Sequence, residues 1–159
     1  MNEGMNAAGP SNDEYETPEW LYMALHHEFD FTMDGAARID PKTVQVGKDR
    51  RPLKLTQGNA LAPMFSTREV FSHWSSQRIY CNPPYSDIDP FVALACTGQP
   101  LLAVLLLPVR TDNDWFFRIL SAERLGSCTI RFFRKRIKFC LNRKPADSPR
   151  FPSMLAIWR

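Results

Sequence analysis

The spacing of apolar residues along the chain predicts alternating helices and strands. Thr17 before Pro18 is typical of a helix start, because threonine caps the first turn and proline fits the first helical position. Apolar residues then recur at the spacing of one helix face. They are Trp20, Leu21, Ala24 and Leu25. Further helices are expected over residues 88–96 and 113–123.

The extended segments include one continuous apolar run, residues 101–107. Such a run is typical of a strand that is buried on both faces of a parallel sheet. Shorter strands are expected at 29–33, 78–81, 128–132, 137–141 and 153–158, with others near 44–46 and 53–55.

This alternation predicts an α/β fold, a mostly parallel sheet with helices on both faces. Residues 14–159 have the length of one domain, and residues 1–13 are expected to form a flexible tail. In such sheets, ligands bind beyond the carboxyl ends of the strands. The loops that follow the strands are therefore where the chemistry is expected.

The strongest chemical signal is Asn82-Pro83-Pro84-Tyr85, which follows the strand at 78–81. A conjugated amino nitrogen is a poor nucleophile, and two acceptors aimed at its N–H groups localise its lone pair. The side-chain oxygen of Asn82 and the carbonyl of Pro83 can be these acceptors. Pro83 and Pro84 stiffen the turn, and Tyr85 offers a ring on which a planar base can stack. The alternative is an ordinary Pro-Pro turn in which Tyr85 only packs.

The same four residues leave the substrate open. The motif resembles that of enzymes that methylate the amino group of adenine, the side-chain amide of glutamine or the amino group of guanine in RNA. The motif therefore predicts methyl transfer to a planar conjugated nitrogen more firmly than it predicts adenine.

Several segments, in this order, resemble the phage DNA N-6-adenine methyltransferase family of the Dam type. They are Thr17-Pro18 with Leu21, Phe29-Asp30-Phe31, Asp34-Gly35-Ala36-Ala37, residues 81–86, Leu107-Pro108-Val109-Arg110-Thr111-Asp112, Trp115-Phe116, Arg136-Ile137-Lys138-Phe139 and residues 151–155. The resemblance implies a Rossmann-like S-adenosylmethionine-dependent methyltransferase fold. It implies a DNA (adenine-N6)-methyltransferase that uses S-adenosyl-L-methionine on double-stranded DNA, with site-specific or relaxed recognition.

The resemblance also implies which residues act. The catalytic residues are Asn82, Pro83, Pro84 and Tyr85. The cofactor-binding residues are Thr17, Pro18, Asp34, Gly35, Ala36, Asn59 and Asn82. Asp34 can hold the ammonium group of the cofactor, and the small residues after it let the backbone approach the ligand. Asn59 stands where the family usually has an acidic residue. Asp40 and Asp49 are the candidates for a ribose contact.

DNA is expected to contact exposed cations and the stacking ring, namely Tyr85, Arg110, Arg134, Lys135, Arg136 and Lys138. The last four lie, together with Arg131, in a basic segment interleaved with Phe132, Phe133 and Phe139. A solvated basic strand whose aromatic residues face the core is the alternative.

Composition limits the other classes of protein. The net charge of +3 is compatible with a nucleic-acid partner but does not identify one. The longest apolar run is too short to span a membrane. The four cysteines match neither a zinc site nor a disulfide framework, so no metal and a cytoplasmic location are expected, in the host cytoplasm if the chain is phage-encoded. The competing functions are methylation of RNA or of a glutamine amide, and a catalytically weakened DNA-binding or inhibitory protein on the same fold.

Overall fold

A computed structural model of the chain describes residues 13, 15–36, 74–141, 144–147 and 149–159. Some of the predictions fall outside these residues. They are most of the tail at 1–13, the strands near 44–46 and 53–55, and Ala37, Asp40, Asp49 and Asn59.

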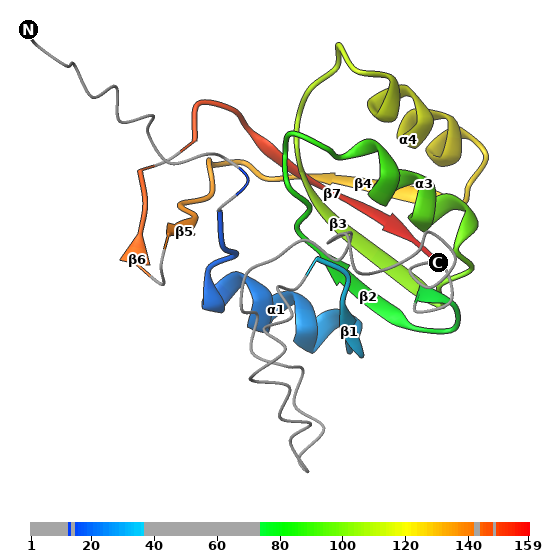
Figure 1. Ribbon diagram of the computed structural model, residues 1–159, viewed down its shortest axis with the longest axis horizontal. Helices are drawn as coiled ribbons and strands as arrows, with labels where there is room; N and C mark the ends of the chain where they lie inside the picture. Colours follow the sequence, from blue (N-terminus) through cyan, green and yellow to red (C-terminus); the bar gives the residue numbers. More distant parts are fainter. Residues whose placement is uncertain (1–12, 14, 37–73, 142–143, 148) are drawn as a thin grey trace, which may run out of the picture.

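A five-stranded sheet forms the centre of the described fold (Figure 1). In spatial order its strands are β1 (Met33–Asp34), β2 (Arg78–Cys81), β3 (Leu102–Pro108), β7 (Ser153–Trp158) and β4 (Cys128–Phe132). The β1–β2 and β2–β3 pairs are parallel, whereas β7 is antiparallel to both β3 and β4. It follows that β4 runs in the same direction as β1, β2 and β3.

The sheet is therefore mixed, which confirms the α/β class but only part of the expected mostly parallel arrangement. The difference comes from β7, which enters between β3 and β4 against the direction of both. A central position explains its composition, since every residue of Ser153–Trp158 is buried.

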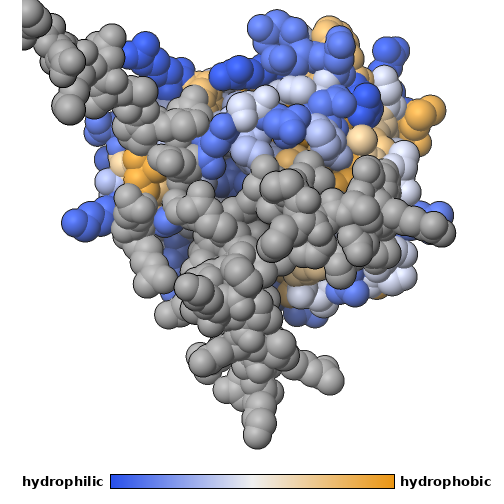
Figure 2. All heavy atoms as spheres, viewed as in Figure 1, coloured by the Kyte–Doolittle hydropathy of each residue, from blue (hydrophilic) through white to orange (hydrophobic). Residues whose placement is uncertain are grey.

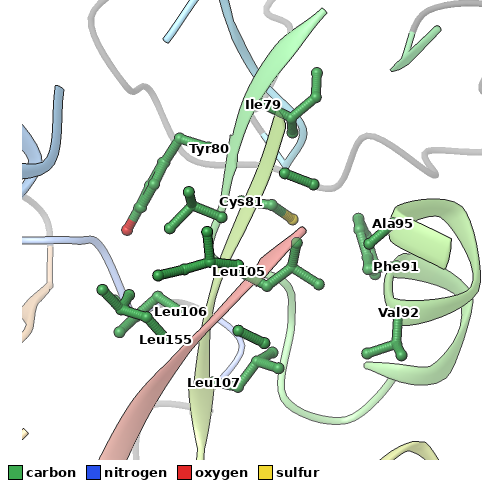
Figure 3. Close-up of a cluster of buried hydrophobic side chains, with 14 of the residues drawn as sticks. Ile79, Tyr80, Cys81, Phe91, Val92, Ala95, Leu105, Leu106, Leu107 and Leu155 are labelled. Carbon is green, nitrogen blue, oxygen red and sulfur yellow. The ribbon is translucent and has the colours of Figure 1, made fainter. Parts of the chain in front are cut away.

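Three helices pack on the two faces of the sheet among the described residues: α1 (Glu19–Phe29), α3 (Asp89–Thr97) and α4 (Asp114–Arg124). On the α1 side, Tyr22 packs edge-on against Tyr80 of β2, with ring centroids 5.3 Å apart. On the other side, the Cys81 sulfur points toward α3, which carries Phe91, Val92 and Ala95 (Figure 3). The helix α4 packs against α3 and β4 on that same side. The alternation of β2 side chains thus assigns α1 to one face and α3 with α4 to the other.

Two predicted strands differ from the structure. Phe29 ends α1 and is no part of a strand, and the strand that follows is only Met33–Asp34. The helix end is held by Arg78, whose guanidinium donates to the Phe29 carbonyl, and by Asp30 in the left-handed conformation with φ 50°. Of the strand predicted at 137–141, only β5 (Cys140–Leu141) forms, paired with β6 (Lys144–Pro145) in a separate two-stranded sheet.

Large apolar side chains are exposed at separate positions of the described surface. On the face shown in Figure 2, hydrophobic patches are likewise interrupted by hydrophilic side chains. None of the helices in the described ranges is long and apolar enough to cross a membrane.

Candidate active site

The loop that follows β2 brings Asn82 into contact with the segment that precedes α1. The Nδ2 of Asn82 donates a hydrogen bond of 2.9 Å to the backbone carbonyl of Tyr15. The other end of the same amide, Oδ1, is buried and has no hydrogen-bond partner among the described residues. The bond to Tyr15 therefore orients the amide and leaves its oxygen as an unused acceptor.

The two prolines give the loop its fixed shape. Pro83 is buried, and the Pro84 carbonyl accepts the N–H of Asp87 at 3.1 Å. Within the described part of the chain, no hydrogen bond reaches the Pro83 carbonyl. The N–H of Ser86 donates to Oδ1 of Asp13 at 2.8 Å. The segment before α1 thus holds the loop at a second point, while the Pro83 carbonyl stays available.

Tyr85 contributes to the core in this structure. Its ring is 7% exposed and lies edge-on to Phe139 and Phe151, at centroid distances of 6.2 and 5.4 Å. Burial raises the pKa of the Tyr85 phenol, and its hydroxyl has no hydrogen-bond partner among the described residues. The packing alternative thus describes this state of the ring, and base stacking stays a prediction.

Thr17 does not cap α1 as its position suggested. Its hydroxyl instead forms a hydrogen bond with the phenol of Tyr80, and Pro18 occupies the N-cap position without a side-chain cap. The Pro18 carbonyl accepts the N–H groups of Leu21 and Tyr22 at 3.0 and 3.1 Å. The competing partner on β2 explains the correction, because the hydroxyl that would close the helix end ties the segment to the sheet.

Asp34 lies at the carboxyl end of β1 and is only partly exposed. Loss of hydration on burial raises the pKa of its carboxyl group to about 7, although the N–H of Ala36 donates to Oδ1 at 3.0 Å and opposes that rise. The same carboxylate raises the pKa of Tyr22 and Tyr80, in both cases after burial as the larger cause. A carboxyl group that has lost hydration and has so little compensation is a suitable partner for a ligand cation.

Gly35 has a packing role in the core that the sequence did not predict. A Cβ at this position would lie 2.4 Å from Cζ2 of Trp74 and 3.0 Å from Cγ2 of Ile79. Trp74 is fully buried, so the space that a side chain would take is filled by its indole ring. In the described structure, the missing side chain serves core packing, and the close approach of a ligand to Gly35 stays a prediction.

The basic segment divides according to exposure. Arg134, Lys135, Arg136 and Lys138 are exposed, as is Arg110 in the loop after β3. The interleaved aromatic residues differ from one another: Phe139 is buried, Phe133 is partly buried and Phe132 is 63% exposed. Arg131 pairs with Glu28 at 2.6 Å and lies over the ring of Phe29, which gives it a structural role.

Tyr15, Tyr80 and Trp74 contact the predicted site residues without having been singled out in the sequence. The hydrogen bond between Asn82 and Tyr15 joins residues 67 positions apart. Its acceptor is a backbone carbonyl, which every residue has, so the sequence pattern does not predict it. The aromatic side chains of Tyr80 and Trp74 could have been predicted to lie in the core, since large aromatic residues are often buried. Their contacts with the site residues could not.

A metal centre has no support in the described residues, where no group of three or more His, Cys, Asp or Glu side chains could hold an ion. All four cysteines are free thiols.

The comparison with protein families identifies a relationship over about two thirds of the chain. The family model described as DNA N-6-adenine-methyltransferase (Dam) matches residues 53–159. The matched range includes the loop after β2 and the basic segment, whereas Thr17, Pro18 and Asp34 precede it. A search of curated proteins gave no match, and neither did a search of solved structures.

Proposed function

Because the chain belongs to the DNA N-6-adenine-methyltransferase (Dam) family, we propose that it methylates the exocyclic amino nitrogen of adenine in double-stranded DNA. The proposed methyl donor is S-adenosyl-L-methionine, and the proposed fold is the Rossmann-like methyltransferase fold in a single domain over residues 14–159. The family membership supports DNA as the substrate over RNA or a glutamine amide.

The observation that carries the proposal is the unpaired acceptor on Asn82. Its Oδ1 is buried, has no partner among the described residues and is held in one orientation by the bond from Nδ2 to Tyr15. An unpaired buried acceptor costs free energy and therefore calls for an explanation. A target N–H that donates to Oδ1 would satisfy it.

The Pro83 carbonyl is the proposed second acceptor. The ring of proline fixes φ, so this carbonyl needs little reorganisation when a substrate binds. Two acceptors on one amino group draw its N–H bonds into a fixed plane and localise the lone pair on nitrogen. The protein contribution is therefore alignment and polarisation of the target nitrogen.

The cofactor is proposed to lie at the carboxyl ends of β1 and β2. S-adenosylmethionine, when bound, supplies the activated methyl group. The Asp34 carboxyl group fits the ammonium group of such a ligand, because burial has raised its pKa to about 7 and a cation would stabilise its ionised form. The remaining proposed contacts are Thr17, Pro18, Gly35, Ala36, Asn59 and Asn82.

Double-stranded DNA is proposed to lie along the carboxyl edge of the sheet. The exposed cations Arg134, Lys135, Arg136 and Lys138 follow β4, which points toward the same edge as β2. Arg110 extends this charge from the loop after β3 and lies 6.0 Å from the Phe151 ring. Cations in this position would bind phosphates while the target base leaves the helix and reaches Asn82 and Tyr85.

The deciding experiment is incubation with methyl-labelled S-adenosylmethionine and unmethylated double-stranded DNA, followed by mass spectrometry of the nucleosides. We expect N6-methyladenine. RNA and glutamine-containing peptides are tested in parallel. Label in these and not in DNA would favour the other acceptors of the motif. Cofactor binding without any product would favour the weakened DNA-binding protein.

A further inference from the structure

We propose that the backbone carbonyl of Tyr15 is the positioning group that turns the Asn82 amide so that its oxygen faces the target nitrogen. The inference rests on the proposed function and adds a residue to its machinery. Tyr15 itself touches neither substrate nor reacting atoms in this account, since it acts through Asn82.

The two ends of an asparagine amide have opposite hydrogen-bonding character, although they have nearly the same shape. Nδ2 can only donate, and Oδ1 can only accept. At 2.9 Å, the Tyr15 carbonyl bonds to Nδ2 but would repel Oδ1. A turned amide would lose this bond and would present N–H groups to an amino group that must also donate. The contact with Tyr15 therefore excludes the orientation in which Asn82 cannot assist.

The Tyr15 carbonyl is held in place on both sides. The Tyr15 ring stacks on Phe139, with centroids 5.1 Å apart and planes inclined by 11°. Glu16 exchanges two backbone hydrogen bonds with Cys140, of 2.8 and 2.9 Å. The next residue, Thr17, bonds to a side chain of β2. Because these contacts come from both the β5 segment and the sheet, the carbonyl forms a fixed reference for the amide.

The arrangement predicts an unusual property of Asn82→Asp. The carboxyl oxygen that replaces Nδ2 would face the Tyr15 carbonyl, an acceptor against an acceptor. Protonation of that oxygen restores the donor, while the other oxygen remains the acceptor for the target. The introduced carboxyl group should therefore have a raised pKa, and its neutral form should be the active one.

The first test follows the rate of DNA methylation by Asn82→Asp between pH 5.5 and pH 8.5, a range of roughly three pH units chosen to span the raised pKa. The rate, divided by that of wild type at each pH, should fall about tenfold per unit above the pKa of the new carboxyl group. Gln99→Glu is the control, because it adds the same charge at an exposed position before β3, away from the carboxyl edge of the sheet, and should keep the wild-type profile. The pKa of the new carboxyl group can also be measured directly by carbon-13 NMR of protein labelled at aspartate. The signal that Asn82→Asp adds to the wild-type spectrum should show the raised pKa, and this measurement does not depend on activity.

The second test separates positioning from folding. Tyr15→Ala removes the stack on Phe139, so kcat should fall about tenfold or more with little change in the KM for DNA. Tyr15→Phe keeps the ring and should restore most of the lost kcat. When Tyr15→Ala is added to Asn82→Asp, the pH dependence should weaken, because the two sites are coupled through one hydrogen bond.

The outcomes are distinguishable. A raised carboxyl pKa that falls when Tyr15→Ala is added supports the inference, because burial of the site would raise the pKa with or without the contact to Tyr15. If Asn82→Asp is inactive at every pH, its NMR titration and the kcat of the Tyr15 variants decide in the same way. An ordinary carboxyl pKa, or equal kcat values for Tyr15→Ala and Tyr15→Phe, would overturn the role of Tyr15 and leave the proposed function standing. A wild type that methylates no DNA would overturn the proposed function, whereas the NMR titration would still decide on the contact.

Discussion

Replacement of Asn82 by alanine tests the proposed chemistry most directly. The substitution removes the unpaired acceptor Oδ1 together with the donor that bonds to Tyr15. We expect methyl transfer to fall by about 100-fold or more, by analogy with the loss of other preorganised polar groups at reacting centres. The loss should appear mainly in kcat, because the acceptor matters most as the target nitrogen changes its geometry.

The effect on stability should be small, for a reason that the structure supplies. Loss of the bond between Asn82 and Tyr15 costs about 1 kcal/mol, and the Tyr15 carbonyl is left without that donor. Removal of a buried unpaired oxygen returns about 1–3 kcal/mol. The two changes have opposite signs, so we expect the free energy of unfolding to change by no more than about 2 kcal/mol.

Three measurements on the same preparation separate these effects. Single-turnover transfer of a labelled methyl group gives the rate, calorimetry gives the cofactor affinity, and urea unfolding gives the stability. The proposed role of Asn82 requires that the rate falls sharply while cofactor affinity and stability stay close to wild type. Methylation of DNA by Asn82→Ala at the wild-type rate would refute it, whatever the fold.

Other consequences can be measured separately. Asp34→Ala should weaken S-adenosylmethionine binding by about 1–3 kcal/mol in calorimetry, and wild-type affinity should rise with pH as the Asp34 carboxyl group ionises near its pKa of about 7. Because that pKa is raised from 3.8, the folded state holds an extra proton between the two values, so the free energy of unfolding should fall as pH rises through that window. Asp34→Asn, followed by urea unfolding at several pH values, should flatten this dependence. Charge reversal at Arg134 and Lys135 should weaken DNA binding and flatten its dependence on salt in anisotropy titrations, because fewer counterions are released; an unchanged slope would return these residues to a solvated surface. Tyr85→Phe should preserve or slightly raise thermal stability, because it removes a buried unpaired hydroxyl group, whereas Tyr85→Ala should reduce both stability and methylation.

The sequence predicts the strands of this fold better than their arrangement. The bounds expected at 78–81, 128–132 and 153–158 agree with β2, β4 and β7, because β-branched and aromatic residues mark strands whichever way they point. The direction of each strand in the sheet is not predicted by such residues. The antiparallel direction of β7 depends on how residues 133–152 connect it to β4. That connection forms only short strands among its described residues, and their local pattern does not fix the direction in which β7 enters the sheet.

The candidate site shows the same division between what is local and what is not. The motif at residues 82–85 could be recognised because its chemistry lies in consecutive residues. The packing role of Gly35 could not be recognised, since the indole ring that leaves no room for a side chain belongs to Trp74, which is distant in the sequence. Ile137 and Phe139 likewise belong to a real apolar alternation and are buried, but the segment does not join the central sheet. Phe139 packs instead against the rings of Tyr15 and Tyr85.

Three of the five buried side-chain polar atoms without a hydrogen-bond partner in the described structure lie at the carboxyl edge of the sheet. Asn82 Oδ1 and Tyr85 Oη are buried without partners in the described structure, and so is the hydroxyl group of Ser153, which lies opposite Pro108 at the start of β7. Each such group costs about 1–3 kcal/mol. The adjacent strand β3 offsets this cost, because all seven of its residues are buried and each buried leucine contributes about 1.5–3 kcal/mol. A stable central strand therefore lets the neighbouring loop keep its acceptors unpaired and fixed in direction. Acceptors with this property need no reorganisation when an amino group arrives, which is the physical basis for placing the chemistry at Asn82.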